Sequence, residues 1–312
     1  MFNKLKNKTI LITGGTGFFG KVLIDFFFNL NEEHNLNLQL IVTARSVLKD
    51  DRIKFLAHDI KEPLVIDEKI DFIIHAATPV ANDASSPDHL LEVIVNGTQN
   101  VLNFAHENKI TKLINISSGA VYGTQPKELS KLDESYASKV SVYEPTNIYG
   151  SGKRIAENLV TKFCREHGIS YLTLRCFAFS GEYLPQNAQF AIGNFVRDAK
   201  KDGVIKIKGD GSAIRSYLDS NDMAEWVLAA LLSDETDKNY NLGSEHEVTI
   251  LQLAEIIAGL IPSTKIEVEN KLSANIKTNR YIPDVSKIMS ELGVTQKVSL
   301  KNSIEKMIKF ES

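Results

Sequence analysis

The stretch that most restricts the fold is residues 9–20, where a short apolar run gives way to closely spaced glycines and then to a helix-like segment. Residues 9–13 read Thr-Ile-Leu-Ile-Thr, and Gly14, Gly17 and Gly20 follow before an apolar segment that starts at Lys21. This order predicts a strand, a tight glycine turn and a helix. Glycines let the backbone turn sharply and let a pyrophosphate approach the N–H groups at a helix N-terminus. The pattern favours a dinucleotide-binding unit over a mere tight turn, although its spacing is one residue off Gly-x-Gly-x-x-Gly.

Strand-like and helix-like segments then alternate without an internal repeat. An α/β fold with a doubly wound parallel sheet, the Rossmann fold, is the architecture that this alternation predicts. The expected strands are residues 38–43, 53–58, 71–77, 111–116 and 169–175, and the expected long helices are residues 88–107 and 147–167.

The regular alternation of strand-like and helix-like segments stops after Cys176. We expect residues 1–176 to form the dinucleotide-binding domain and residues 177–312 a smaller α/β region that binds substrate, with elements near 218–243 returning to the first domain. This second region lacks a continuous strand–helix–strand pattern. It is expected to hold a short strand at 204–207 and helices at 188–200, 222–232, 250–260, 285–292 and 300–308.

Composition excludes several classes of protein. The net charge is −3 and the basic residues are scattered, so we expect no nucleic-acid partner. No secretory or membrane-spanning apolar segment is found, which predicts a cytoplasmic protein. Cys164 and Cys176 show no metal-ligand spacing, so two buried thiols and no metal site are expected.

The ends of the expected strands at 38–43 and 71–77 carry residues that could contact a bound dinucleotide. Residues 39–48, at the end of the second expected strand, contain no acid but do contain Arg45. An Arg at the end of this strand accommodates a 2′-phosphate on the adenosine ribose. The pattern favours NADP(H), with NAD(H) possible; an exposed loop Arg is the alternative. Ala76 and Ala77 are small enough for a ligand to lie against their backbone, and His75 is expected to be a positioned structural residue rather than a base.

Tyr149 and Lys153 form the candidate proton-transfer pair. On a helix they stand four residues apart and share one face. A phenol has a free pKa of about 10, so it needs a nearby ammonium in a water-poor cleft to ionise near neutrality. A Tyr-x-x-x-Lys pair could also arise by accident in a chain with nine tyrosines. Ser118, delivered by the strand at 111–116, lies where a hydroxyl could meet substrate, although Ser-Ser-Gly is also an ordinary turn.

Taken in order along nearly the whole chain, these pieces resemble the extended short-chain dehydrogenase/reductase family, in its NAD(P)-dependent nucleotide-sugar epimerase/dehydratase/reductase branch. The residues that carry the resemblance are Thr13 to Gly20, Asp59-Ile60, His75-Ala-Ala77, Asn96-Gly-Thr98, Ser117-Ser-Gly-Ala-Val-Tyr-Gly123, Tyr149 with Lys153, Arg215-Ser-Tyr-Leu, Asp222, Tyr240-Asn-Leu-Gly243 and Arg280-Tyr-Ile-Pro-Asp284.

The resemblance implies a role for each candidate residue. Tyr149 would be the general acid/base, Lys153 would lower its pKa and hold the nicotinamide ribose, and Ser118 would bond the oxygen at the reacting carbon. The implied cofactor-binding residues are Gly14, Thr16, Gly17, Phe18, Phe19, Gly20, Arg45, Asp59, Ile60, Ala76, Ala77, Thr78, Asn96, Ser117, Tyr149 and Lys153. The implied substrate-binding residues are Ser118, Ala120, Phe179, Asn194, Arg215 and Arg280, with the two arginines gripping a diphosphate.

One departure narrows the expected chemistry. Sugar 4,6-dehydratases of this branch carry an Asp-Glu pair where this chain has Gly119 and Ala120, and decarboxylases place a Glu there. Without those carboxylates, reduction of a 4-keto sugar or epimerisation at C4 remains.

With Arg45, the expectation is an NADPH-dependent 4-ketoreductase acting on a nucleotide-linked 6-deoxy-4-keto-hexose, of the dTDP-4-keto-6-deoxyglucose type, for surface polysaccharide such as O-antigen. An NAD-dependent 4-epimerase is the alternative. A reductase of non-sugar ketones and a non-catalytic nucleotide sensor are more distant ones. The resemblance also implies a homodimer through the helices at 88–107 and 147–167.

Overall fold

The computed structural model describes residues 2–79, 86–137, 147–188, 190–270 and 279–310. The chain divides into two compact units, and it crosses from one to the other several times. The first unit comprises Met1–Gly123, Ser138–Cys176 and Ala224–Tyr240, and the second comprises Thr124–Ala137, Phe177–Met223 and Asn241–Ser312.

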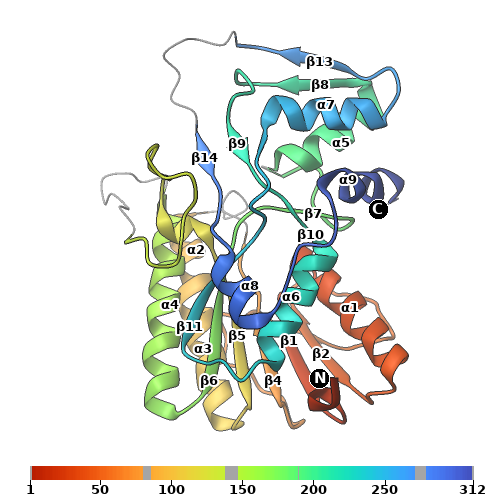
Figure 1. The fold of residues 1–312 in the computed structure, drawn as a ribbon. Coiled ribbons are helices and arrows are strands. Elements are labelled where there is room, and N and C mark those ends of the chain that lie inside the picture. The colour runs from red at the N-terminus through yellow and green to blue at the C-terminus, as the bar shows by residue number, and fades with distance from the viewer. Residues whose placement is uncertain (1, 80–85, 138–146, 189, 271–278, 311–312) are drawn as a thin grey trace. The chain divides into compact units, whose positions relative to one another are not determined.

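The first unit is built on a seven-stranded sheet with the order β11-β6-β5-β4-β1-β2-β3. The pairs from β6 through β3 are parallel. From β1 the chain winds outward through β2 and β3, and then returns to β4 and winds the other way, so β1 and β4 flank the point where the strand order reverses (Figure 1). The strands are β1 Thr9–Thr13, β2 Gln39–Ala44, β3 Lys54–Ala57, β4 Phe72–His75, β5 Lys112–Ser118, β6 Ser170–Cys176 and β11 Lys238–Leu242. The doubly wound parallel α/β fold expected from the sequence is confirmed.

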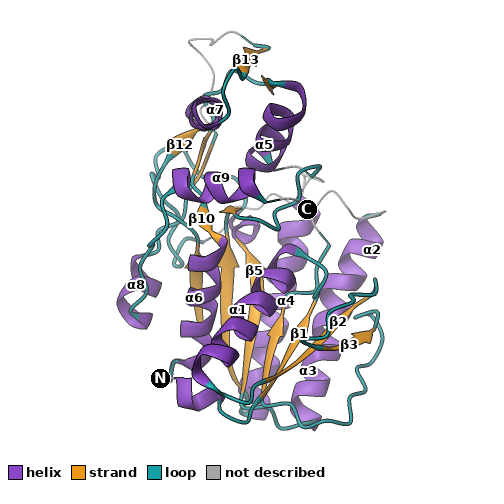
Figure 2. Ribbon diagram, turned by 90° about the vertical axis from the view of Figure 1, so that its right-hand side faces the viewer, coloured by secondary structure: helices purple, strands orange, loops and turns teal. Residues whose placement is uncertain are grey.

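Helices cover this sheet on both faces because right-handed crossovers in opposite winding directions place their helices on opposite sides. The helix α1 lies on one face, and α3 and α4 lie on the other (Figures 1 and 2). The helices and helical turns of this unit are η1 Phe2–Leu5, α1 Phe18–His34, α2 Pro87–Leu91, η2 Glu92–Asn96, α3 Gly97–Glu107, η3 Gly119–Tyr122 and α4 Ile148–His167, together with most of α6 Ser220–Leu232.

The expected helix at 88–107 is interrupted. A π-helical turn, η2, separates α2 from α3. Immediately after it, a Cβ on Gly97 would come within 2.9 Å of the side chain of Ile60. The close approach of the helix to the segment after β3 therefore depends on the glycine.

A continuous apolar core lies between the sheet and the helices α3 and α4. It is dominated by branched aliphatic side chains, as expected where parallel strands are covered on both faces. The fully buried members include Leu11, Ile41, Ile73, Val101, Leu102, Leu113, Val160 and Cys164. The two cysteines are free and buried, as expected.

The second unit contains short strands and small helices. Its strands are β7 Phe179–Ser180, β8 Val204–Ile207, β9 Ile214–Arg215, β10 Leu218–Asp219, β12 Val248–Thr249, β13 Lys265–Val268 and β14 Arg280–Tyr281. They form the pairs β10-β7 and β13-β8 and the three-stranded sheet β12-β9-β14. The helices are α5 Ala191–Asp202, α7 Ile250–Leu260, α8 Ser286–Leu292 and α9 Leu300–Lys309, close to the ranges expected.

The segment after η3, Thr124–Ala137, belongs to the second unit, and residues 138–146 lie outside the described residues. Within the described ranges, no helix combines the length and the apolar character needed to cross a membrane.

Candidate active site

The glycine turn joins β1 to α1 and packs against neighbouring backbone. Gly14 has a φ of +81°, which favours glycine, and a Cβ there would lie 2.8 Å from the Cα of Ala77. A Cβ on Gly20 would lie 2.4 Å from the Cα of Gly15. At Gly17, in contrast, a Cβ would meet only the carbonyl oxygen of Gly14, at 3.3 Å. The turn itself therefore requires Gly14 and Gly20, whereas a Cβ at Gly17 would meet a single backbone atom.

The start of α1 is where the sequence predicts that the pyrophosphate of a dinucleotide binds. Gly17 is the N-cap of α1, and no side chain caps that end of the helix. Backbone N–H groups at a helix N-terminus favour an anion. The other residues predicted to bind the dinucleotide lie in this turn, at the start of α1, beyond the carboxyl ends of β2, β3 and β4, in β5 or at the end of η2: Thr16, Phe18 and Phe19, then Arg45, Asp59, Ile60, Ala76, Ala77, Thr78, Ser117 and Asn96.

His75, at the end of β4, is buried in a chain of hydrogen bonds. The hydroxyl of Thr98 donates to the carbonyl oxygen of Ile94, at 2.6 Å, so its contact with His75 Nε2, at 3.2 Å, requires the ring N–H to donate. His75 Nδ1 then accepts from the hydroxyl of Thr13, at 2.8 Å. That hydroxyl in turn accepts from the backbone N–H groups of the two residues after His75, each at 3.2 Å. His75 therefore orders the strand end beside the glycine turn, and burial lowers its pKa to about 3, which keeps the ring neutral.

Tyr149, Ser118 and Lys153 come together where β5 ends against the first turns of α4. The side chain of Ser118 makes a hydrogen bond to the Tyr149 hydroxyl. The ammonium group of Lys153 donates to the hydroxyl of Thr78, at 2.7 Å, and to the carbonyl oxygen of Ile116, at 2.9 Å. Tyr149 and Lys153 lie four residues apart on α4, and each has a hydrogen-bond partner in β5.

The pKa of Tyr149 departs from the expectation in direction. Burial raises it to about 12, and the hydrogen bond from Ser118 only partly opposes this shift. Burial also lowers the pKa of Lys153 to about 8, against the opposing influence of Cys176 and Glu157. The expected lowering of the phenol pKa by the lysine is therefore not what this structure gives. Desolvation is the largest cause of both pKa shifts. The ammonium group of Lys153 donates its hydrogen bonds to Thr78 and Ile116.

The turn after Ser118 carries no carboxylate. It forms the 3₁₀ segment η3, Gly119–Tyr122, in which the backbone N–H of Ala120 donates to the Ser118 hydroxyl at 3.1 Å. A Cβ on Gly150 would lie 2.3 Å from the carbonyl oxygen of Ala120. The turn thus packs directly on the start of α4, and neither Gly119 nor Ala120 can supply a second acid or base.

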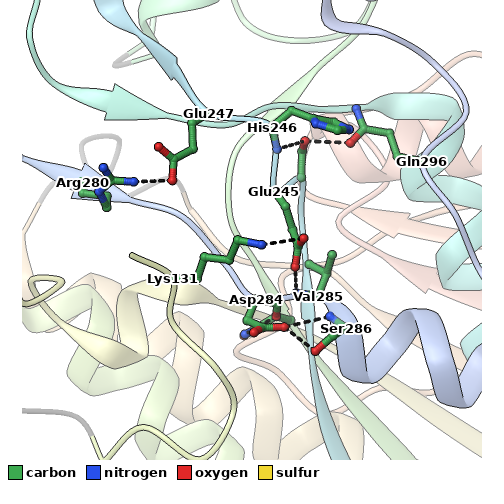
Figure 3. A network of polar contacts seen from close by, with 11 residues as sticks. Lys131, Glu245, His246, Glu247, Arg280, Asp284, Val285, Ser286 and Gln296 are labelled. Carbon is green, nitrogen blue, oxygen red and sulfur yellow. Dashed lines mark hydrogen bonds and ion pairs between the residues drawn. The ribbon is translucent and has the colours of Figure 1, made fainter. Parts of the chain in front are cut away.

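The predicted substrate-binding arginines lie on adjacent strands of the second unit. Arg280 on β14 pairs with Ile214, the neighbour of Arg215 on β9, and its guanidinium forms an ion pair with Glu247 (Figure 3). Arg215 donates to the carbonyl oxygens of Ile214, at 2.7 Å, and Asn279, at 3.1 Å. Burial lowers the pKa of Arg215, and no carboxylate of the described chain forms an ion pair with it.

The same view shows polar contacts that join the segments around these strands. Lys131 donates to Glu245 at 2.7 Å, and the other oxygen of that carboxylate accepts from the backbone N–H of Val285 at 3.0 Å (Figure 3). The two remaining predicted residues of this unit lie elsewhere in it. Phe179 is buried in β7, and Asn194 on α5 donates to the carbonyl oxygen of Ala188 at 2.8 Å.

A model of the NAD dependent epimerase/dehydratase family matches residues 10–243, well over half of the chain. The chain belongs to this family. The resemblance inferred from the sequence is thereby confirmed at the level of the family and its fold.

Curated relatives of this family member include nucleotide-sugar enzymes of plants. UDP-glucuronic acid decarboxylase 6 of Arabidopsis thaliana is 29% identical over 311 residues, with 96% of this chain and 88% of the relative covered. UDP-glucuronic acid decarboxylase 1 of the same plant is 28% identical over 311 residues, with 97% and 69% covered.

Solved structures of similar fold include two epimerases. UDP-glucose 4-epimerase from Thermotoga maritima, solved with UDP-glucose, superposes with a TM-score of 0.82 at 22% identity, covering 97% of this chain and 98% of that one. UDP-glucuronic acid 4-epimerase from Bacillus cereus, solved with UDP-glucuronic acid and NAD, superposes with a TM-score of 0.80 at 20% identity, covering 97% and 98%. These likenesses establish the fold of this epimerase/dehydratase family member.

Sequence reasoning missed one cluster beneath the site. Ser117 donates to Glu157 at 2.6 Å, and Arg175 makes an ion pair with the same carboxylate at 2.8 Å. Glu157 stands four residues after Lys153, and this spacing was the one local signal that could have revealed it. Arg175 comes from β6, and no local pattern predicts that it pairs with Glu157 on α4.

Proposed function

We propose that this protein is an NAD(P)-dependent oxidoreductase that interconverts an alcohol and a ketone at C4 of a nucleoside-diphosphate sugar. The observation that carries the proposal is the cluster of Tyr149, Ser118 and Lys153 followed by a turn without carboxylates. Such a site can move one proton at one oxygen. It lacks the second acid and base that elimination of water would need.

In the proposed mechanism the phenol of Tyr149 exchanges the proton at the sugar oxygen, and the Ser118 hydroxyl orients that oxygen. Lys153 keeps a positive charge beside the site and holds Thr78 at the end of β4. A dinucleotide held at Gly14, Gly17 and Gly20 supplies the hydride acceptor and donor when bound.

The finer proposal is a 4-epimerase that acts on a UDP-sugar with NAD. Its support comes from the similar structures, which include UDP-sugar 4-epimerases, and from the curated relatives, whose names also specify a UDP-sugar. Epimerisation removes and returns a hydride at the same carbon, so it consumes no reductant. The available groups at Tyr149, Ser118 and Lys153 suffice for it.

A second candidate is a 4-ketoreductase of a nucleotide-linked 6-deoxy-4-keto-hexose that uses NADPH. Arg45 favours it, because this residue is exposed directly after β2 and no acid occupies the end of that strand. A guanidinium there suits a 2′-phosphate, whereas an acid would select a free 2′-hydroxyl.

Arg215 and Arg280 are the proposed ligands of the sugar nucleotide's diphosphate. Arg215 supports this role because it is partly buried and its hydrogen bonds go to backbone carbonyls rather than to a carboxylate. A guanidinium fork matches phosphate oxygens in geometry and charge.

One experiment tests the proposal and its two forms. The purified protein is incubated with NAD⁺, NADH or NADPH and with UDP-glucose, UDP-galactose, UDP-glucuronic acid or dTDP-4-keto-6-deoxyglucose, and products are identified by NMR. Interconversion of UDP-sugars with NAD⁺ and without net change in nicotinamide absorbance supports the epimerase. Stoichiometric oxidation of NADPH with the keto sugar supports the reductase, and release of CO₂ from UDP-glucuronic acid contradicts both.

The matched control is Tyr149→Phe, which removes only the ionisable hydroxyl. We expect it to lower turnover by about 10²- to 10⁴-fold while cofactor binding persists. Turnover undiminished in this variant would refute the proposed site.

A further inference from the structure

We propose that Glu157 is a positioning residue, which clamps helix α4 to the carboxyl ends of β5 and β6 and thereby sets Tyr149 and Lys153 against Ser118. The inference rests on the proposed function and adds a residue to its site. Glu157 itself is buried, and among the described residues assigned to substrate or cofactor its hydrogen-bond partner is Ser117.

The register between β5 and α4 places the contact of Glu157 between the other two contacts of the site along β5. Three consecutive residues of β5 each contact a different turn of the helix. The carbonyl oxygen of Ile116 accepts from Lys153 at 2.9 Å, Ser117 donates to Glu157 at 2.6 Å, and Ser118 bonds the Tyr149 hydroxyl. Of these three, the contact at Glu157 is the one that an ion pair reinforces.

The ion pair between Glu157 and Arg175 is multidentate and largely buried. Arg175 Nε lies 3.1 and 3.2 Å from the two oxygens of Glu157, and one of its terminal nitrogens lies 2.8 Å from Oε2. The side chains of Glu157 and Arg175 are only 8% and 13% exposed. A multidentate, nearly dry pair of this kind fixes geometry, because a shift of the helix would leave a buried charge without its partner.

Arg175 extends the clamp to the turn after Ser118. Its other terminal nitrogen donates to the Tyr122 hydroxyl at 3.0 Å, and its guanidinium carbon lies 4.9 Å from the centre of the Tyr122 ring. Tyr122 closes η3, the turn that starts directly after Ser118. The pair therefore connects α4, β5, β6 and η3, the four elements that surround the proposed proton-transfer group.

The charge of Glu157 also acts on Lys153. The charged and titratable groups that bear on the ammonium from the packed elements are His75 from β4, Cys176 from β6 and Glu157 from α4. Burial lowers the pKa of Lys153, and Glu157 opposes that shift. Arg175 compensates Glu157, so removal of the carboxylate alone leaves an excess positive charge close to the lysine.

The test compares Glu157→Gln with the double variant Glu157→Gln/Arg175→Met. Glu157→Gln keeps a side chain of the same shape that can still form hydrogen bonds, but it leaves the Arg175 guanidinium without a carboxylate partner. The double variant removes both charges at once. Glu166→Gln is the matched control, because Glu166 lies on the same helix, is 53% exposed and pairs with Lys162.

Two measurements distinguish a residue that positions the site from one that only stabilises the fold. With the nucleotide sugar that the wild-type protein turns over, we expect Glu157→Gln to lower kcat by about 10²-fold with a much smaller change in KM. The double variant should regain thermal stability and not kcat, because the clamp is absent in it. By NMR of ¹⁵N-labelled lysine side chains, the pKa of Lys153 should fall in Glu157→Gln and return towards the wild-type value in the double variant.

The inference is overturned if the double variant recovers kcat together with its melting temperature, or if Glu157→Gln leaves kcat and the pKa of Lys153 unchanged. Failure of the proposed function has a different signature. In that case the wild-type protein and Tyr149→Phe do not differ on any nucleotide sugar tried, and the lysine readout alone decides whether Glu157 controls the site.

Discussion

The ammonium group of Lys153 donates a hydrogen bond to the hydroxyl of Thr78 at 2.7 Å, and that hydroxyl donates in turn to the carbonyl oxygen of Ala77 at 2.8 Å. A helix residue is thus joined through one hydroxyl to the strand end that faces the glycine turn. This contact physically couples the proposed proton-transfer group to the proposed dinucleotide site.

Replacement of Thr78 should reveal the strength of that coupling. Thr78→Val leaves the buried ammonium with one fewer acceptor, so we expect a loss of about 1–3 kcal/mol in the free energy of unfolding at pH 7, measured with urea. Thr78→Ser, which keeps the hydroxyl, should lose much less. The pKa of Lys153 is about 8 in the folded protein, so the loss should shrink above that pH, where the amine is neutral. An equal loss at pH 7 and pH 9.5 would contradict this account.

The ionisation of Tyr149 should depend on the cofactor. In the protein alone its pKa is raised to about 12 by burial, so the phenol stays protonated at pH 10. Oxidised NAD carries a positively charged ring, and a nearby positive charge lowers the pKa of a phenol. Ultraviolet difference spectra of the wild-type protein against Tyr149→Phe should therefore show phenolate at pH 10 only when NAD⁺ is added. Ser118→Ala should shift the ionisation to higher pH, since it removes the hydrogen bond that opposes burial.

The glycine turn allows packing and binding to be separated. Gly17→Ala should melt within a few degrees of the wild-type protein yet bind the dinucleotide at least about tenfold more weakly, because its methyl group is added at the start of α1, where the pyrophosphate is predicted to bind. Gly20→Ala should instead cost about 2 kcal/mol or more of stability, because its methyl group meets backbone. Gly259→Ala is the control, since no atom lies within 4 Å of its Cβ position. Normal dinucleotide affinity in Gly17→Ala would rule out the predicted site.

His75 should make the fold sensitive to acid. Its folded pKa is about 3 and its ordinary value is 6.5, so the unfolded chain binds more protons between these two pH values. The free energy of unfolding should therefore fall as the pH drops from 6.5 towards 3, by up to about 1.4 kcal/mol per pH unit from this group. His75→Asn should flatten the dependence between pH 6.5 and 4. Parallel curves for the wild-type protein and His75→Asn would show that the ring is not held neutral.

The main elements of the first unit could be predicted because each carries its own local signal. The apolar run before Gly14 became β1, and the periodic segment around Tyr149 became α4, within one residue of the expected start. The two-residue strands β7, β9, β10, β12 and β14 could not be predicted, since pairs such as Ile214-Arg215 are too short to show a period. They exist only because distant segments pair with them.

The electrostatics of the site were predicted less well than its composition. The sequence places Tyr149 and Lys153 on one helix face, but it does not say how deeply that face is buried. Burial reverses the direction of the expected shift in the phenol pKa. The partners that hold Lys153, at Thr78 and Ile116, come from two other strand ends and have no signature near Lys153 in the chain.

The position of β11 in the sheet has a consequence for synthesis on the ribosome. This strand, Lys238–Leu242, neighbours β6, which ends at Cys176, yet more than sixty residues of the second unit and α6 are translated between them. A nascent chain therefore presents the backbone of β6 as an unpaired edge for several seconds at ordinary elongation rates. Any fragment that stops near residue 176 should keep this edge open permanently, and self-association is its expected fate.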